Sequence, residues 1–400
     1  MVLAVWALMP VAGPEAMARG SCIGSDGQEY RYSIQNSQEI LRYDTHYLFP
    51  AEVNAIVADS AAVWVRDTSY AAGGFIRVLH NAYCGVGTGC SDGTTPIDYD
   101  GFGYAAIYAA RSSSASLESF STEYPVSGGA VPGNRNVVRD ANGTAMYGMT
   151  HPRLLGVSDA EWWLFHVSGG DIYAAKAGSA TAGDFVDDTA DCGASTGASC
   201  SPATSATPVL DNDQMARDTG KSNYGSSTNG LSSTVAFLQV KISGAAYFRI
   251  FVSGTDGDFT NPLAIYTYLA PASDLRSWRF EGGPRVGDDS SSDPTQYALR
   301  PASKLIRRRG GCVTLFFQSW EATMRLPVIR YANSSDSGLS FGTPRTLTDS
   351  SGSDLTNVSG AELVRAKRQW FILYDKTPDA DGDGTPDGGV INMGELVFEN

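Results

Sequence analysis

The chain has 400 residues, of which 42 % are hydrophobic and 18 % are charged, so it can bury one large core or two modest ones. Its 44 glycines, together with many serines and threonines, are typical of an all-β protein with tight turns. The formal net charge of −14 argues against a nucleic-acid partner, because phosphate binding requires a basic face.

The first segment, residues 1–18, resembles a secretory signal peptide. An apolar run from Val2 to Val11 leads to Ala16-Met17-Ala18, which has the small-x-small pattern of a cleavage site. The usual basic segment is missing, so a buried N-terminal strand or helix is the alternative. No other stretch approaches the ~20 apolar residues of a membrane helix. We therefore expect a secreted, periplasmic or cell-surface protein without a transmembrane segment.

The six cysteines agree with an oxidising compartment. Two pairs lie within the Gly- and Ser-rich stretches "CGVGTGC" and "CGASTGASC", and neither stretch has a metal-ligand partner nearby. We interpret Cys84–Cys90 and Cys192–Cys200 as disulfides that each close a short loop. The remaining pair, Cys22 and Cys312, is assigned to a third disulfide by elimination.

A weak repeat emerges when the chain is aligned on four tyrosines. Each copy reads as a strand end, a small polar turn and an aromatic residue that opens the next strand. The copies are "YAARSSSASLESF" (108–120), "YAAKAGSATAGDF" (173–185), "YLAPASDLRSW" (268–278) and "YANSSDSGLSF" (331–341).

Two strands rich in Val, Leu, Ile, Phe and Trp precede each turn, as expected for strands buried on both faces. The unit is therefore four strands, A to D, at about the length of a propeller blade. The second strand of each unit is expected over residues 75–83, 162–169, 246–254, 312–321 and 369–376. We count five blades within residues 59–400, starting near residues 59, 150, 233, 301 and 361. The one helical pattern is "PAEVNAIVADS", near residue 50.

The last blade lacks a clear strand D. The segment "EYRYSIQNS" (29–37) has strand composition, so the N-terminal segment 19–58 could close the ring by supplying it. Two alternatives stay open: the chain ends within blade five, or the N-terminal region forms a sixth blade.

Two of the turns resemble those of known propeller families. The stretch "SSDSGLSF" is similar to the Asp-box, or BNR repeat, of sialidases, with Ser334, Asp336, Gly338 and Phe341 at its defining positions. The stretch "ASDLRSW" (272–278) resembles a turn of five-bladed arabinanase, β-xylosidase and invertase-type glycosidases. The resemblance implies an all-β, five-bladed propeller of four-stranded antiparallel blades that acts on glycans.

The Asp-box stretch also has a mechanical interpretation. The carboxylate of Asp336 can cap backbone N–H groups of its own turn, Gly338 can take a positive φ, and Phe341 can pack inward. In the resembled families such turns join strands C and D on the face away from the substrate. A sugar contact at this turn is the less favoured alternative.

The opposite face, where each strand A begins and each strand B ends, is therefore the expected functional face. Three of the four histidines fall there. The charged, polar and aromatic residues at these strand ends are Asp59, His80, His151, Arg153, His166, Arg300, Gln318, Trp320, Glu321, Glu362 and Asp375.

The resemblance implies a catalytic carboxylate, a second carboxylate that tunes pKa, and a glutamic acid that donates a proton. Glycoside hydrolysis needs one ionised and one protonated carboxyl at the same pH. Asp59 stands where the first carboxylate is expected, and Glu362 or Glu321 could be the acid. His151 stands where the second aspartate is expected, which is a departure from the family pattern.

The substrate-binding candidates are His80, His151, His166, Arg300 and Trp320, whose ring could stack on a sugar. Structural alternatives remain for each. Asp59 could cap a turn, His80 and His166 could be hydrogen-bonded in the wall, and Arg300 could pair with Glu362. A zinc site of the three histidines is a further alternative without supporting ligand spacing.

The stretch "DADGDGTPD" (379–387) resembles a calcium loop. Asp379, Asp381, Asp383 and Asp387 stand at positions one, three, five and nine, with a glycine at the sharp turn. Position twelve holds Val390 where an EF-hand has glutamate. A solvated acidic turn is the alternative, and we expect a structural Ca²⁺.

Together these features predict a monomeric, secreted, calcium-stabilised propeller that acts on a polysaccharide or glycan as a glycoside hydrolase. One alternative is a non-catalytic carbohydrate-binding or cell-surface adhesion propeller. The other is a sialidase-like hydrolase.

Overall fold

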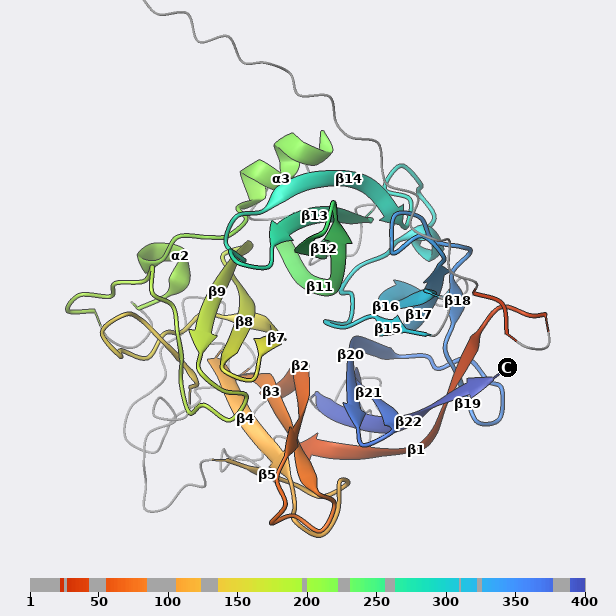
Figure 1. Ribbon diagram of the computed structural model, residues 1–400, viewed down its shortest axis with the longest axis horizontal. Helices are drawn as coiled ribbons and strands as arrows, with labels where there is room; N and C mark the ends of the chain where they lie inside the picture. Colours follow the sequence, from red (N-terminus) through yellow and green to blue (C-terminus); the bar gives the residue numbers. More distant parts are fainter. Residues whose placement is uncertain are drawn as a thin grey trace, which may run out of the picture.

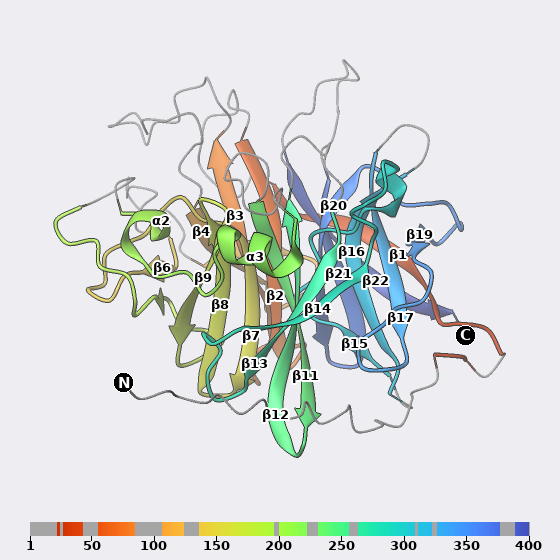
Figure 2. The same cartoon turned by 90° about the horizontal axis from the view of Figure 1, so that it is seen from above.

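The computed structural model is an all-β propeller whose five blades surround a central axis (Figure 1). Seen from the side, the strands of the blades run along that axis (Figure 2). The structure describes residues 22–24, 27–42, 55–84, 106–123, 136–195, 200–221, 231–255, 263–308, 311–321, 326–376 and 389–399. The signal-like residues 1–18, Cys90 and the acidic stretch 379–387 lie outside the described residues.

The first three blades follow one another along the chain. Blade one contains β2 (Ala55–Arg66), β3 (Gly74–Cys84), β4 (Ala106–Ser112) and β5 (Phe120–Thr122). Blade two contains β7 (Thr150–Ser158), β8 (Glu161–Ser168), β9 (Asp171–Ala177) and β10 (Phe185–Val186), with β6 (Val138–Arg139) outside them. Blade three contains β11 (Leu231–Ile242), β12 (Ala245–Thr255), β13 (Ile265–Pro271) and β14 (Arg279–Val286).

The last two blades complete the ring. Blade four contains β15 (Ile306–Arg307), β16 (Val313–Trp320), β17 (Pro327–Ser334) and β18 (Arg345–Thr346). Blade five contains β20 (Val358–Ala366), β21 (Gln369–Lys376), β22 (Val390–Glu399) and β1 (Arg31–Arg42), with β19 (Thr348–Asp349) at its edge. The five predicted blades are confirmed.

Ring closure joins the two ends of the chain. Strand β1 runs antiparallel to β22, with Tyr32 opposite Phe398 and Arg42 opposite Val390. The strand expected from residues 29–37 therefore lies outermost of the four main strands of blade five, and the propeller also includes residues ahead of residue 59. The alternative of a sixth, N-terminal blade is wrong because this strand is already used in blade five.

The apolar B strands are buried on both faces, as their composition predicts. In β8, Trp163 and Phe165 pack into a cluster shared with blade three, whereas Leu164 packs into a cluster shared with blade one. Neighbouring blades are thus held together by side chains that alternate along one strand.

The helix prediction near residue 50 is wrong where it can be compared, because residues 55–60 belong to β2. Three short helices were not anticipated: α2 (Pro202–Ser205), α3 (Asn212–Thr219) and the 3₁₀ helix η4 (Pro294–Gln296). Helix α3 does carry end signals. The Asp211 carboxylate accepts a hydrogen bond from Gln214 N at 2.5 Å, and Gly220 follows in the left-handed conformation. No helix in the described part of the chain is long and apolar enough to cross a membrane.

The turn at 334–341 has the hydrogen bonds expected of it. Asp336 Oδ1 accepts from the backbone N–H groups of Leu339 and Ser340 at 3.0 and 2.9 Å. Gly338 has a φ of 84°, and the ring of Phe341 lies 5.8 Å from that of Phe251 in an edge-on contact. The turn joins β17 to β18, so it is a C–D turn as predicted.

Two buried arginines, Arg77 and Arg249, each connect their own blade to a C–D turn of the next blade. Arg77 donates to both carboxylate oxygens of Glu123 at 2.8 and 2.7 Å, and to the Ala180 carbonyl in the C–D turn of blade two at 2.6 Å. Arg249 donates to both oxygens of Glu281 at 2.6 Å and to the carbonyl of Ser337 in the C–D turn of blade four. Each guanidinium thus joins its own outer strand to the next blade.

Two of the three expected disulfides lie within the described residues. Cys22–Cys312 joins the N-terminal segment to the start of β16, and Cys192–Cys200 closes a short loop in the connection after blade two. The predicted Cys84–Cys90 disulfide stays a prediction, because Cys90 lies outside the described residues.

The two disulfides should differ in their effect on stability. They span 290 and 8 residues, and the chain-entropy contribution grows with the logarithm of loop length. Replacing Cys22 and Cys312 with serine should therefore lower the free energy of unfolding by about 3 kcal/mol more than replacing Cys192 and Cys200. Denaturant unfolding of both double variants measures this difference. Equal losses would contradict it.

Candidate functional site

The backbone is irregular at or just before the inner strands of four blades, within β2, β7 and β20 and in the segment that leads to β15. Asp59, His151, Arg300 and Gly360 have φ values of 51°, 53°, 45° and 61°. In β2, β7 and β20 the pairing register shifts at this point, which marks a β-bulge. A positive φ is uncommon outside glycine and costs about 1–3 kcal/mol, and such strain clusters at functional sites. The predicted functional face is thus distinguished by its backbone.

The Asp59 carboxylate lies at the meeting point of these irregular segments. Its Oδ2 is 3.4 Å from His151 Nε2, and its Oδ1 is 3.6 Å from the Arg300 guanidinium. Asn81 Nδ2 donates to Oδ2 at 3.5 Å. Asp59 is only 5 % exposed. The structure therefore brings together three of the predicted site residues, Asp59, His151 and Arg300.

Asp375 supports Asp59 from blade five. Both of its carboxylate oxygens accept from Asp59 N at 3.0 Å. Gly360 makes room for this carboxyl, since a Cβ atom at Gly360 would lie 1.9 Å from Asp375 Oδ2. The sequence placed Asp375 on this face but gave it no role. The sequence feature that could have revealed this role is an aspartate at the end of strand B, combined with a glycine near the start of strand A of the same blade.

The two carboxyls have pKa values that move in opposite directions. Burial, followed by the negative charge of Asp59, raises the pKa of Asp375 well above 3.8. Burial also opposes ionisation of Asp59, but nearby positive charges outweigh it and lower the pKa of that group: those of Arg300 and Arg153, together with that of His151 at low pH, where its ring is protonated. Ionisation is thus favoured at Asp59 and disfavoured at Asp375, so over a range of pH above 3.8 the site holds an ionised Asp59 beside a protonated Asp375.

His151 is neutral at the same pH. Burial lowers the pKa of His151 to about 3, although Asp59 opposes the shift. Its Nδ1 lies 2.8 Å from the Thr150 hydroxyl. When Nδ1 accepts that hydroxyl proton, Nε2 carries the ring's own proton and faces Asp59. The histidine can then orient the carboxylate without adding charge.

Glu362 occupies a different environment. It is fully buried, and its carboxylate accepts from Ser303 N at 2.9 Å and from the Ser303 hydroxyl. Lys304 Nζ lies 3.4 Å away and also donates to the Ala62 carbonyl. The suggested Arg300–Glu362 ion pair is not formed, because Arg300 pairs with Asp59 and Glu362 with Lys304. Glu362 therefore joins blades one, four and five.

The remaining aromatic and histidine candidates lie in the propeller wall. His80 is fully buried, with Nδ1 3.0 Å from the Asn81 carbonyl oxygen. His166 stacks on Tyr173, and burial lowers its pKa to about 3. Trp320 is 5 % exposed and packs edge-on against Tyr297. All three rings are buried, so none of them is accessible to a ligand at the central axis of the propeller.

Other predicted residues are only partly placed. Glu321 follows β16 directly and is half-buried, with its backbone N–H bonded to the Leu326 carbonyl at 3.0 Å. Among the described side chains, no group of three or more His, Cys, Asp or Glu could hold a metal ion, so the three histidines do not form a zinc site. The calcium-loop aspartates cannot be judged here because they fall in an undescribed range.

Known proteins share this architecture but not the sequence. No family model matches the chain, and no curated protein matches it by sequence. A GH62 hydrolase in complex with xylotriose has a TM-score of 0.55 at 9 % identity, over 92 % of this chain and 97 % of that one. The catalytic domain of Coprinopsis cinerea GH62 α-L-arabinofuranosidase has a TM-score of 0.52 at 13 % identity, over the same shares of 92 % and 97 %.

A thermostable family-43 glycoside hydrolase is similar over 86 % of this chain and 91 % of its own, with a TM-score of 0.50 at 11 % identity. Sequence identities this low establish a common fold and leave the chemistry to be argued from the site.

The raised pKa of Asp375 makes a pH-dependent prediction. The unfolded chain ionises this group near 3.8, whereas the folded chain keeps it protonated to higher pH. Its contribution to stability is therefore complete below that value and is lost as pH rises through the folded pKa. Asparagine mimics the protonated acid, so the stability of Asp375→Asn relative to the native chain should grow as the pH rises above about 4, until the pH reaches the pKa of the folded state. Thermal melts across this range measure the trend. A difference independent of pH would contradict it.

Proposed function

We propose that this protein is a glycan-active hydrolase whose reaction centre is Asp59. The observation that carries the proposal is the pair of carboxyls, Asp59 and Asp375, whose pKa values are displaced in opposite directions at the centre of the predicted face. Pairs of carboxyls whose pKa values are shifted in opposite directions are typical of sites of acid–base catalysis. The propeller fold shared with glycoside hydrolases adds support.

In this proposal Asp59 is the ionised group that acts as base or nucleophile. Asp375 is a positioning residue, because it holds the Asp59 backbone N–H rather than facing the funnel. His151 orients the carboxylate and Arg300 keeps it charged. Glu321 is the candidate proton donor, since Glu362 is sequestered by Ser303 and Lys304. A protonated partner for Asp59 is required for glycoside hydrolysis.

A non-catalytic glycan-binding propeller is the second candidate. It is favoured by His151 in place of a second carboxylate and by the Arg300–Asp59 ion pair. A sialidase-like activity has less support, because recognising a sugar carboxylate requires available arginines. Arg153 is fully buried against backbone carbonyls, and Arg249 is bonded to Glu281.

Export of the chain is part of the proposal. The two disulfides suit an oxidising compartment. A pentose-containing polysaccharide is the first substrate class to test, because one structural neighbour was solved with xylotriose.

Sugar release from xylan, arabinoxylan, arabinan and mannan tests the catalytic role. Asp59→Asn should lower the rate at least ~100-fold, because a neutral amide cannot serve as base or nucleophile. Glu321→Gln should lower it by a similar factor. Asp67→Asn, in an exposed turn of blade one, is the matched control and should retain full activity. Full activity of Asp59→Asn would refute the assignment. Binding without any hydrolysis by the native chain would favour the second candidate.

Calcium binding by the loop at 379–387 is a separate proposal. Four aspartates at alternating positions repel one another without a cation and match the oxygen ligands that Ca²⁺ prefers. A chelator should lower the melting temperature, because removing a ligand of the folded state removes its binding free energy from stability. Asp381→Asn combined with Asp383→Asn should lower the melting temperature in calcium and abolish the chelator effect. An unchanged melting temperature on chelation would contradict the site.

A further inference from the structure

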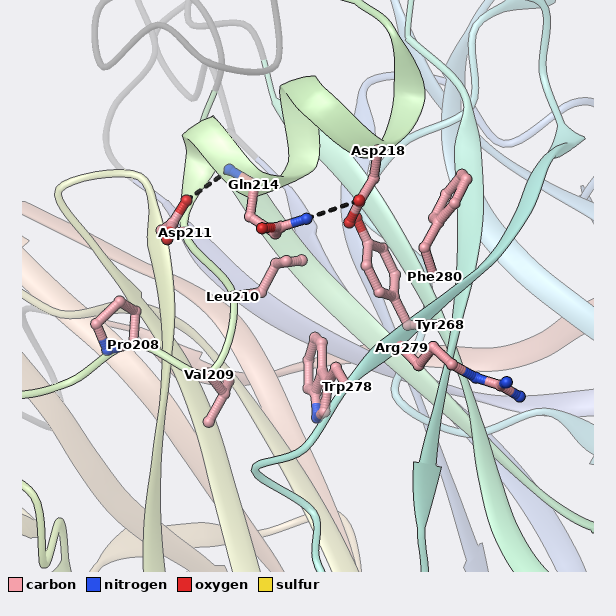
Figure 3. Close-up of a pocket in the computed structure, with 10 residues that line it drawn as sticks. All are labelled: Pro208, Val209, Leu210, Asp211, Gln214, Asp218, Tyr268, Trp278, Arg279 and Phe280. Atoms are coloured by element: carbon pink, nitrogen blue, oxygen red, sulfur yellow. Dashed lines mark hydrogen bonds between the residues drawn. The ribbon is translucent and has the colours of Figure 1, made fainter. Parts of the chain in front are cut away.

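The outer side of blade three contains a cavity that shares no residue with the Asp59 site. Helix α3, from the connection between blades two and three, lies beside β14 in Figure 1. Between this helix and the outer strands is a cavity of about 420 Å³, within the range of small-molecule sites. Its lining residues, drawn in Figure 3, are Pro208, Val209, Leu210, Asp211, Gln214, Asp218, Tyr268, Trp278, Arg279 and Phe280.

Three aromatic rings, those of Tyr268, Trp278 and Phe280, form one side of the cavity. Trp278 is half-buried, and its indole N–H donates to the Leu275 carbonyl at 2.7 Å. Its ring is packed against Phe165 and Tyr268, with centroid separations of 5.8 and 6.2 Å. The indole is therefore held in one orientation before any ligand arrives, which reduces the entropy lost on binding.

Helix α3 supplies hydrogen-bonding groups opposite the rings (Figure 3). Gln214 Nε2 donates to Asp218 Oδ1 at 2.7 Å, and the Asp211 carboxylate caps the helix. A carboxylate has about four acceptor positions, and the bond from Gln214 uses one of those on Asp218. The exposed Arg279 provides donors at the edge. The cavity thus combines fixed aromatic surface with oxygen acceptors.

We propose that this cavity is an accessory binding site for a neutral oligosaccharide. A sugar ring offers C–H faces that pack on aromatic rings and hydroxyl groups that donate to carboxylates. An anion is disfavoured by Asp211 and Asp218, and Arg279 at the edge offsets part of the attraction that these two carboxylates exert on a cation. The inference rests on the proposed glycan activity, because the same polymer that reaches Asp59 would also be held here by another of its segments.

Binding can be measured separately from hydrolysis. In an Asp59→Asn background, titration with xylohexaose and affinity electrophoresis in soluble arabinoxylan should both detect the site. Trp278→Ala should weaken binding about ten-fold, because aromatic anchors dominate such sites. Trp278→Phe, which keeps a ring, should weaken it less. Asp218→Ala should also weaken binding. Trp370→Ala, a half-buried tryptophan of blade five, is the matched control and should change nothing.

The outcomes separate the two proposals. Unchanged binding in folded Trp278→Ala would overturn the accessory site; if that variant does not fold, unchanged binding in both Trp278→Phe and Asp218→Ala would do so. Absence of binding to both glycans would overturn it as well. Spermine bound in their place would show a cation site instead. The hydrolase proposal fails independently, if the native chain releases no sugar or Asp59→Asn retains activity.

Discussion

The contact between the Asp375 carboxyl and the Asp59 backbone N–H is the constraint on which the site depends. It joins blade one to blade five, the blade in which the two ends of the chain pair. Gly360 is needed to admit the carboxyl, and Asp59 adopts a left-handed conformation above it. Stability of the ring closure and orientation of Asp59 are therefore coupled. Strand β1 and the Cys22–Cys312 disulfide tie the N-terminal segment to blades five and four.

The same contact separates the charge states of the two acids. Buried carboxyls this close cannot both ionise at little cost, and the nearby Arg300 and Arg153 favour ionisation of Asp59. A neutral His151 adds a hydrogen-bonding group without disturbing this balance. Nearby, Glu362 and Lys304 are bonded to each other and to backbone groups of blades one, four and five. The Asp59 carboxylate is thus held by neighbours from several blades.

The blade count, the C–D turns and the face that carries the site could be predicted from sequence. They follow from local patterns: apolar B strands, a turn aspartate that caps its own backbone, and aromatic residues at fixed spacing. The role of Asp375 could not, because it depends on a contact between residues more than 300 positions apart. The sequence could not decide between a substrate contact and burial for His80, His166 and Trp320, because a polar or aromatic strand end looks alike in either setting. Helix α3 was missed because tertiary packing overrides weak local propensity.

The central claim is that Asp59 is ionised above a protonated Asp375. Carbon-13 labelling of aspartate carboxyls, with signals assigned by Asp59→Asn and Asp375→Asn, measures both groups in one NMR titration. The account predicts one carboxyl that remains ionised at pH values below 3.8 and a second that remains protonated well above it. Two carboxyls that titrate together near 3.8 would contradict it.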